Sequence, residues 1–301
     1  MSVQEDVRFK APAFRRSFVS SYGKIPLERW TSFLVAVAAC VVVFWRLGPA
    51  DIFTDSTPTG GDMGAHVWGP AFLRDHLLPS FQLRGWSPDW YAGFPAMQFY
   101  MVLPYLFIVV FDLLLPYGVA FKLVAISGVV LMPLAAWSMG RLSSWREPLP
   151  GLMAVAALLF VFDFNFTIYG GNIASTLAGE FAFSMGLAAS LLYLGLVHRV
   201  LEHGTHHGRA AVVLAVVALC HPITLLFSVS ATVVHVVVRA VHGFPRRLGV
   251  KSAVVALLLA TLILLGVFSA TSRVFPRLLV VALLLLCLLL LEFRSSMRLL
   301  A

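Results

Sequence analysis

The sequence predicts an all-α fold: a polytopic transmembrane helical bundle with a long extracytoplasmic first loop that carries interfacial helices. Hydrophobic residues make up 60% of the 301 residues and charged residues 12%, whereas soluble domains have about 25% charged residues. The apolar residues form long continuous runs, without the alternation typical of a β-barrel. In lipid such runs must be helical, because every backbone polar group needs a partner within the protein.

The N-terminal segment, residues 1–29, is polar and basic. The positive-inside rule therefore predicts a cytoplasmic N-terminus and a location in the cell membrane. The segment is too charged for a secretory signal peptide, so the first apolar run, residues 30–45, is expected to remain as a membrane anchor. The net charge of +8 comes largely from residues between apolar runs. That distribution predicts membrane lipids, and not nucleic acid, as partners.

The first loop, residues 48–98, is rich in Asp, Gly, Pro and aromatic residues, which is typical of a segment lying outside at the membrane interface. The apolar run that follows it, residues 99–116, contains Pro104 and Asp112. If this run crossed the membrane, Arg141 and Arg146 would lie outside, against the positive-inside rule. We therefore expect residues 99–116 to form an interfacial helix along the outer face.

Four later runs are expected to complete a membrane module that covers residues 30–240. They comprise residues 119–140, 148–162, 173–197 and 210–238. The last of these runs is broken at His221-Pro222, which allows either a hairpin or one tilted span. Residues 241–301 contain two further apolar runs, 252–272 and 278–291, which predict additional transmembrane helices.

The first candidate site lies in the outer loop. Asp62 follows Gly60 and Gly61, which allow the backbone to approach a ligand closely. His66 lies one helical turn after Asp62 and on the same face. This pair is suited to share a proton or a divalent cation. The alternative is that Asp62 only caps a helix that runs through Leu78.

The second candidate site begins with residues 169–172, in which two glycines are flanked by Tyr169 and Asn172. Glu180 is expected two turns into an apolar helix, where an ionisable residue is usually functional or paired with another helix. Asn172 can instead be a simple helix cap. In the predicted topology Asp62 and Glu180 both lie at the outer face, so we expect them to face one cleft.

Other residues give weaker indications. His221, before Pro222, is more typical of a helix break than of a ligand. Trp86, Trp90 and Tyr91 can stack on a sugar, but such residues more often form an aromatic belt at the interface. The histidines between the later runs are more typical of a solvated turn than of a metal site.

Together, these motifs resemble the GT-C glycosyltransferase superfamily. The resemblance covers roughly residues 30–240, and its most distinctive part is the segment 86–95. The similarity is to the actinobacterial branch, which includes arabinofuranosyltransferase-type proteins and membrane proteins labelled as related to 6-pyruvoyl-tetrahydropterin synthase. It implies transfer of a sugar from a polyprenyl-phosphate donor to a glycan acceptor at the outer membrane face. By the resemblance, Asp62 is the catalytic base or a metal-site carboxylate, and Glu180 is the second acidic residue.

The complete predicted site has the donor phosphate near Arg74 or Arg84. A divalent cation is expected at Asp62 and His66. The remaining substrate-binding candidates are His66, Trp86, Tyr169, Asn172 and His221. The sequence has no DxD pair, and it ends at Ala301, where such enzymes commonly continue with more spans and an outer soluble domain. Two alternatives therefore stand: a transporter or flippase that uses Glu180 and His221 within the membrane, and a truncated, non-catalytic membrane protein.

Overall fold

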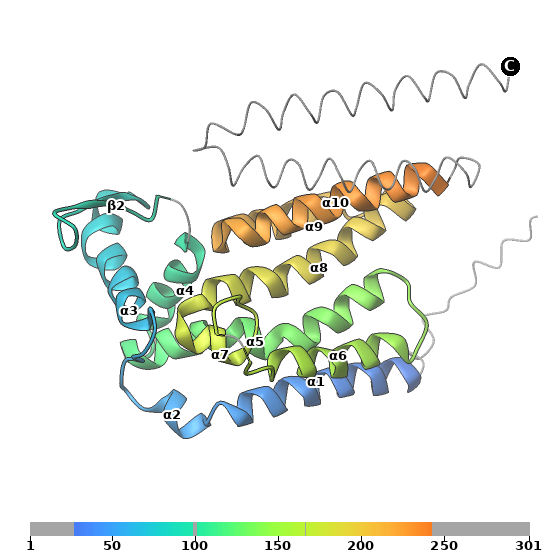
Figure 1. Ribbon diagram of the computed structural model, residues 1–301, viewed down its shortest axis with the longest axis horizontal. Helices are drawn as coiled ribbons and strands as arrows, with labels where there is room; N and C mark the ends of the chain where they lie inside the picture. The colour runs from blue at the N-terminus through green and yellow to red at the C-terminus, as the bar shows by residue number, and fades with distance from the viewer. Residues whose placement is uncertain (1–26, 99–100, 166, 243–301) are drawn as a thin grey trace, which may run out of the picture.

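A computed structural model describes residues 27–98, 101–165 and 167–242. They form a bundle of antiparallel helices with a smaller cap segment (residues 48–116) at one end (Figure 1). The bundle helices are α1 (Leu27–Arg46), α5 (Tyr117–Leu142), α6 (Leu149–Val161), α8 (Phe181–His203), α9 (His207–Cys220) and α10 (Pro222–His242). The expected apolar runs 252–272 and 278–291, and most of the basic N-terminal segment, lie outside the described residues.

Four helices in the described ranges are long and apolar enough to cross a membrane: Leu27–Arg46, Tyr117–Leu142, Ile173–His203 and Pro222–Arg239. The helices α6 and α9 are equally apolar but have only 13 and 14 residues. At about 1.5 Å per residue they extend roughly 20 Å, less than the ~30 Å hydrocarbon core of a bilayer. The expected helical bundle is thus observed, with four candidate spans.

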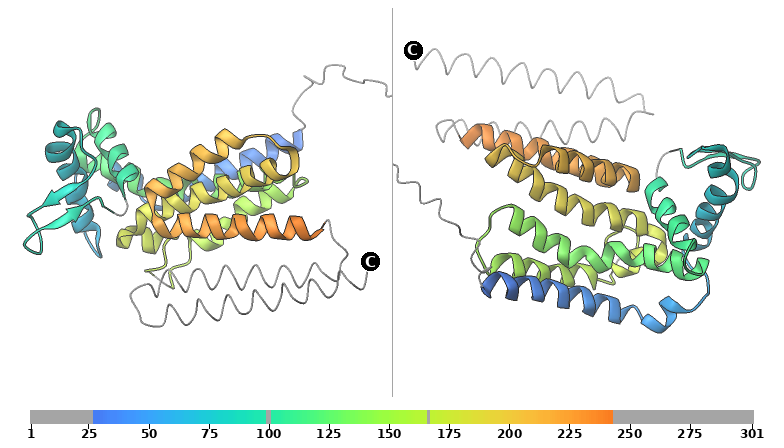
Figure 2. Two further views of the ribbon diagram at one scale, coloured as in Figure 1. Left: turned by 90° about the horizontal axis from the view of Figure 1, so that it is seen from above. Right: turned by 180° about the vertical axis from the view of Figure 1, so that it is seen from behind.

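The long helix α5 lies at the centre of the bundle and packs against α1, α6 and α8 (Figure 2). Its buried face includes Phe121, Val129 and Met132. Gly128 has no side chain at the point where α5 meets α8: a Cβ there would lie 2.4 Å from the backbone nitrogen of Met185. Small residues bring these two backbones together, as is common where helices pack in lipid.

The helices α9 and α10 form a hairpin. The former ends at Cys220 and the latter begins at Pro222, while His221 between them is extended, with φ −155° and ψ 133°. Both helices pack against α8 and against each other. Proline cannot continue a preceding helix without losing a hydrogen bond, and here the chain reverses at that point. The alternative of one tilted span over residues 210–238 is wrong.

The cap segment begins with α2 (Pro49–Phe53) and α3 (Met63–Phe72). The latter continues through a π-helical turn, η1 (Leu73–Leu77), and a 3₁₀ turn, η2 (Leu78–Ser80). Two short strands, β1 (Gly85–Ser87) and β2 (Phe94–Ala96), pair antiparallel. The helix α4 (Val102–Asp112) has 11 residues, or about 16 Å, and is too short to span a bilayer. Its predicted position at the interface stays a prediction.

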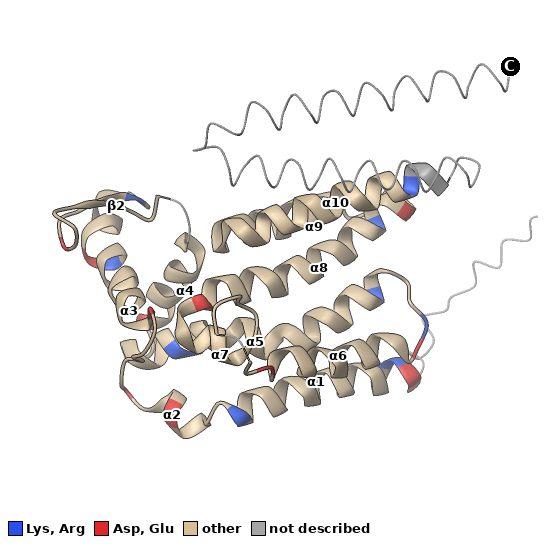
Figure 3. Ribbon diagram, in the orientation of Figure 1, with Lys and Arg blue, Asp and Glu red and all other residues tan. Residues whose placement is uncertain are grey.

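Charge is distributed unequally between the two ends of the bundle (Figure 3). The cap end, within the described ranges, carries Asp51, Asp55, Asp62, Asp75, Asp89, Asp112, Asp163 and Glu180, with Arg46, Arg74, Arg84 and Lys122. The opposite end, called here the arginine end, carries Arg29, Arg141, Arg146, Arg199, Arg209 and Arg239, with Glu28, Glu147 and Glu202. The cap end is therefore net acidic and the arginine end net basic.

Candidate functional site

The two candidate segments meet at the cap end of the bundle. The backbone nitrogen of Asp62 donates a hydrogen bond to the carbonyl oxygen of Ala178, at 2.7 Å. Glycines permit this approach on both sides. A Cβ on Gly61 would lie 2.2 Å from the Ala178 oxygen, and one on Gly179 would lie 2.9 Å from the Asp62 Cβ. The start of α3 and the start of α8 are therefore held in direct contact.

The carboxylate of Asp62 is exposed. Asp62 occupies the N-cap position of α3, but its side chain makes no capping hydrogen bond. The alternative in which Asp62 serves only as a helix cap is therefore not supported. The helical run that begins at Met63 continues through Leu78, as expected, but after Phe72 it passes through the π-helical turn η1 and the 3₁₀ turn η2.

His66, one turn after Asp62, is half-buried. Its Nδ1 is hydrogen-bonded to the hydroxyl of Tyr105 from α4, at 3.1 Å. The edge of the imidazole meets the ring of Phe181, with centroids 5.5 Å apart at 83°. Burial lowers the pKa of His66 below its usual value near 6.5, and the nearby Asp62 carboxylate partly opposes this shift. The imidazole is therefore held neutral at pH 7 and can accept a proton.

Glu180 lies at the break that separates a π-helical turn, η3 (Thr176–Glu180), from α8. Gly179, with φ 129°, interrupts the helix immediately before it. The expectation of a carboxylate two turns inside a continuous helix was therefore wrong, because the apolar sequence conceals a backbone break. Hydroxyl groups hold this segment: Ser184 Oγ donates to the Glu180 carbonyl at 3.0 Å and lies 2.6 Å from Thr176 Oγ1.

The side chain of Glu180 is half-buried, and the backbone of the preceding residue, Gly179, lies directly against Asp62. Within the described ranges, neither carboxylate takes part in an ion pair. Glu180 therefore has no ion-pair partner on another helix among these residues, so they do not support its alternative role as half of such a pair. Two carboxylates without cationic partners and one neutral imidazole share this part of the cap end.

An aromatic cavity of about 640 Å³ opens beside His66. Its walls include Trp68, Trp90, Tyr91, Phe94 and Tyr105. The rings of Trp68, Trp90 and Phe94 form one cluster, with centroids 4.9 to 5.8 Å apart. Trp68 also donates from its indole nitrogen to Asp89, at 2.6 Å, which leaves its ring fixed on the cavity wall.

The sequence indicated Trp90 and Tyr91 but not Trp68 or Tyr105, because only the folded cap brings these side chains from α3 and α4 to the same cavity. Trp86, by contrast, does not line the cavity. Its indole covers Gly93, where an added Cβ would lie 2.3 Å from Nε1, and 66% of the residue is exposed.

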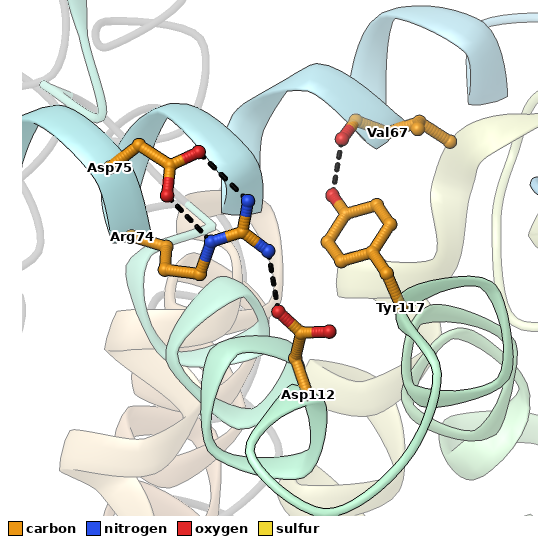
Figure 4. Close-up of polar contacts among 5 residues, drawn as sticks. All are labelled: Val67, Arg74, Asp75, Asp112 and Tyr117. Carbon is orange, nitrogen blue, oxygen red and sulfur yellow. Dashed lines mark hydrogen bonds and ion pairs between the residues drawn. The ribbon is translucent and has the colours of Figure 1, made fainter.

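Arg74 is engaged within the cap segment (Figure 4). Its Nε and Nη2 donate to the two carboxylate oxygens of Asp75, at 2.7 and 2.8 Å, and its Nη1 donates to Asp112 at 2.5 Å. The guanidinium also lies 5.6 Å from the ring centre of Tyr117, whose hydroxyl donates to the Val67 carbonyl. These contacts raise the pKa of Arg74 and lower that of Asp75.

Two carboxylates already neutralise Arg74, so the geometry does not favour the predicted phosphate contact there. The triad ties η1 to α4 instead. Arg84, the other residue predicted to contact phosphate, is exposed in the segment between η2 and β1 and does not line the aromatic cavity.

The remaining candidates have structural contacts. Asn172 is fully buried, accepts from the Ser175 backbone nitrogen at 2.7 Å and so caps α7 (Ile173–Ser175); its amide donates to the Asp163 carbonyl at 2.7 Å. The cap interpretation of Asn172 is confirmed, and burial removes the side chain from any substrate. Tyr169 donates to the Asp163 carboxylate at 2.6 Å, a contact that lowers the pKa of Asp163.

His221 lies in the break between α9 and α10, against the ring of Phe183 at 5.4 Å. Its Nδ1 accepts from the backbone nitrogen of Ile223, at 3.3 Å. The residue is 7% exposed, so it stabilises the helix break, which was the simpler of its two sequence interpretations.

The described part of the chain contains no group of three or more His, Cys, Asp or Glu side chains placed to hold a metal ion. Asp62, His66 and Glu180 approach one another without forming such a three-ligand set. The predicted divalent cation therefore stays a prediction, and it would need ligands from the substrate.

No family model matches the chain, and no curated protein or solved structure matches it either. The function is therefore inferred from the chemistry of the site.

Proposed function

We propose that this chain is a glycosyltransferase-like protein of the cell envelope that transfers a sugar from a polyprenyl-phosphate donor at the outer membrane face. The observation that carries the proposal is the contact between Asp62 and the segment of Glu180, beside an aromatic cavity. Carboxylates provide a base and charge stabilisation, and aromatic faces suit a sugar ring. The resemblance of the motifs to the GT-C superfamily supports the same assignment.

The residues have distinct proposed roles. The acceptor oxygen attacks the anomeric carbon, the bond from that carbon to the phosphate oxygen breaks, and polyprenyl phosphate leaves. Asp62 takes the proton of the acceptor hydroxyl, since its carboxylate is exposed and makes no capping bond. Glu180 stabilises the positive charge that develops on the sugar. His66, neutral and held by Tyr105, orients a hydroxyl group.

A divalent cation would be an alternative use of the same two carboxylates, in place of the roles of base and counter-charge given above. Mg²⁺ is commonly held by one or two carboxylates together with substrate phosphates. Asp62 and Glu180 provide two carboxylates that have no cationic partner among the described residues. A cation bound there would neutralise the departing phosphate, a task for which Arg74 is poorly placed because Asp75 and Asp112 already bind it.

The charge distribution supports the proposed orientation. Lys and Arg are enriched on cytoplasmic ends of membrane helices, so the arginine end is assigned to the cytoplasm and the cap end to the outside. The N-terminus of α1 lies at the arginine end, which agrees with a cytoplasmic N-terminus. A transporter would need polar groups near the membrane midplane, whereas Glu180 and His221 both lie at the cap end of the bundle.

The test is sugar transfer by the full chain from purified polyprenyl-phosphate sugars, for wild type, Asp62→Asn and Glu180→Gln. Loss of a base or a charge-stabilising carboxylate should reduce turnover about 100-fold or more. Asp55→Asn is the matched control, because Asp55 is an exposed acid of the same loop and should leave turnover unchanged.

The melting temperature and donor binding of the Glu180→Gln variant separate a catalytic from a structural role. Normal donor binding and turnover, with or without a lower melting temperature, would remove Glu180 from the site. Equal turnover of Asp62→Asn and wild type would contradict the base assignment. A wild-type chain that neither binds nor transfers any donor would favour the non-catalytic alternative.

A further inference from the structure

A second cavity lies at the arginine end, between α1 and α6. It has a volume of about 580 Å³, and its walls include Glu28, Ser32 and Glu147. Apolar side chains continue the groove toward the bilayer, among them Val35, Leu152 and Val155. Leu152 and Val155 are 56% and 46% exposed. The groove therefore combines a polar head with a lipid-facing apolar wall.

Glu147 is the unusual residue of this groove. Its side chain is only 10% exposed, and one oxygen, Oε1, accepts from Arg141 at 3.1 Å. The other oxygen, Oε2, is buried and has no hydrogen-bond donor among the described residues. Buried carboxylate oxygens are almost always paired, so this oxygen indicates a site that receives a donor from a ligand.

The surroundings restrict the chemistry of that ligand. Glu28 adds a second carboxylate to the same groove. Arg29 and Arg141 line a neighbouring cavity of about 350 Å³ with Trp30 and Trp137. Acidic and basic groups thus stand side by side at the membrane-facing end of α1, an arrangement that complements a zwitterion. A bare metal ion would make no use of the apolar wall.

We infer that the α1–α6 groove binds a phospholipid with a primary ammonium headgroup, such as phosphatidylethanolamine. The ammonium group donates to Glu147 Oε2 and to Glu28, while the phosphate faces Arg29, since Arg141 already pairs with Glu147. One acyl chain lies along Val35 and Leu152. A quaternary ammonium has no N–H to donate, so phosphatidylcholine satisfies the buried oxygen poorly. This site lies at the opposite end of the bundle from Asp62 and does not depend on the proposed transfer reaction.

The experiment measures lipid retention by the purified full chain with native mass spectrometry. Synthetic phosphatidylethanolamine, phosphatidylcholine and phosphatidylglycerol are compared at equal concentration. We expect the ethanolamine lipid to be retained about tenfold better than the choline lipid, as a charge-assisted hydrogen bond predicts. Glu147→Gln should remove most of this preference, and Glu28→Gln should weaken it.

Glu202→Gln is the matched control, since Glu202 lies at the same end but pairs with Arg239 outside the groove; it should leave retention unchanged. Melting temperatures in lipid-free detergent show whether each variant is folded. If Glu147→Gln does not fold, Glu28→Gln decides, because Glu28 is exposed. Equal retention of all three lipids, or an unchanged preference in the folded Glu variants, would overturn the inference.

Discussion

Gly179 sets the distance between the two segments that carry Asp62 and Glu180. Its φ of 129° is unfavourable for any residue with a side chain, and a Cβ there would lie 2.9 Å from the Asp62 Cβ and 3.3 Å from the His66 ring. The sequence showed an acidic residue in each outer segment, and their convergence followed from the predicted topology. It did not show that Gly179 breaks the helix, because an isolated glycine within a helical pattern is tolerated and does not by itself mark a break.

We predict that Gly179→Ala lowers both stability and turnover. The strained backbone should cost about 1–3 kcal/mol, and the added methyl group should push Asp62 and His66 away from Glu180. Thermal unfolding and the transfer assay measure the two effects. Gly204→Ala serves as control: its φ is also positive, at 63°, but no atom lies within 4 Å of the added Cβ. The control should lose some stability and keep its turnover, and equal turnover of both variants would contradict the proposed geometry.

For the helices, the sequence predicted which segments are helical better than it predicted where each helix begins and ends. Long apolar runs identify α1, α5 and α8, because burial in lipid needs uniform hydrophobicity. The sequence did not decide whether α9 and α10 form a hairpin or one continuous span, since His221-Pro222 breaks a helix without fixing the direction of the chain that follows. The pairing of β1 with β2, with Trp86 opposite Pro95, left no recognisable pattern, because three-residue strands are too short to show alternation.

The contact between α5 and α8 allows a prediction at this scale. Gly128→Ala should destabilise the bundle by about 1–3 kcal/mol, the usual cost of overpacking, because its Cβ would meet the backbone of Ser184 and Met185 at 2.4 Å. The thermal unfolding of the detergent-solubilised chain measures this loss. Gly208→Ala, in α9 with no atom within 4 Å of the added Cβ, should be neutral or slightly stabilising. A neutral Gly128→Ala would show that α5 and α8 are less tightly packed than described.

At the scale of the whole molecule, neither the charge distribution nor helix length alone decides which helices cross the membrane. The arginine end and the cap end alternate along the chain, so each bundle helix has to cross the membrane if the two ends lie on opposite sides of it, as proposed. Yet α6, with 13 residues, reaches only about 20 Å along its axis. A bilayer thins around short helices at a modest free-energy cost, and the arginines at one end can extend toward the headgroups. Crossing is therefore feasible, and the positive-inside rule gives its direction.

We predict that cysteines placed before and after α6 react from opposite sides of the membrane. The variants are Ser143→Cys at the arginine end and Thr167→Cys at the cap end, in a chain whose Cys40, Cys220 and Cys287 have been replaced by alanine. A membrane-impermeant thiol reagent added to intact cells should label Thr167→Cys, which is exposed in the loop after α6. It should label Ser143→Cys only after the cells are permeabilised. The opposite result would invert the molecule and place Asp62 and Glu180 in the cytoplasm, where the proposed outer-face reaction is impossible. Labelling of both variants from the same side would mean that α6 does not cross, and labelling of both from outside would also contradict the cytoplasmic assignment of Arg141 and Arg146.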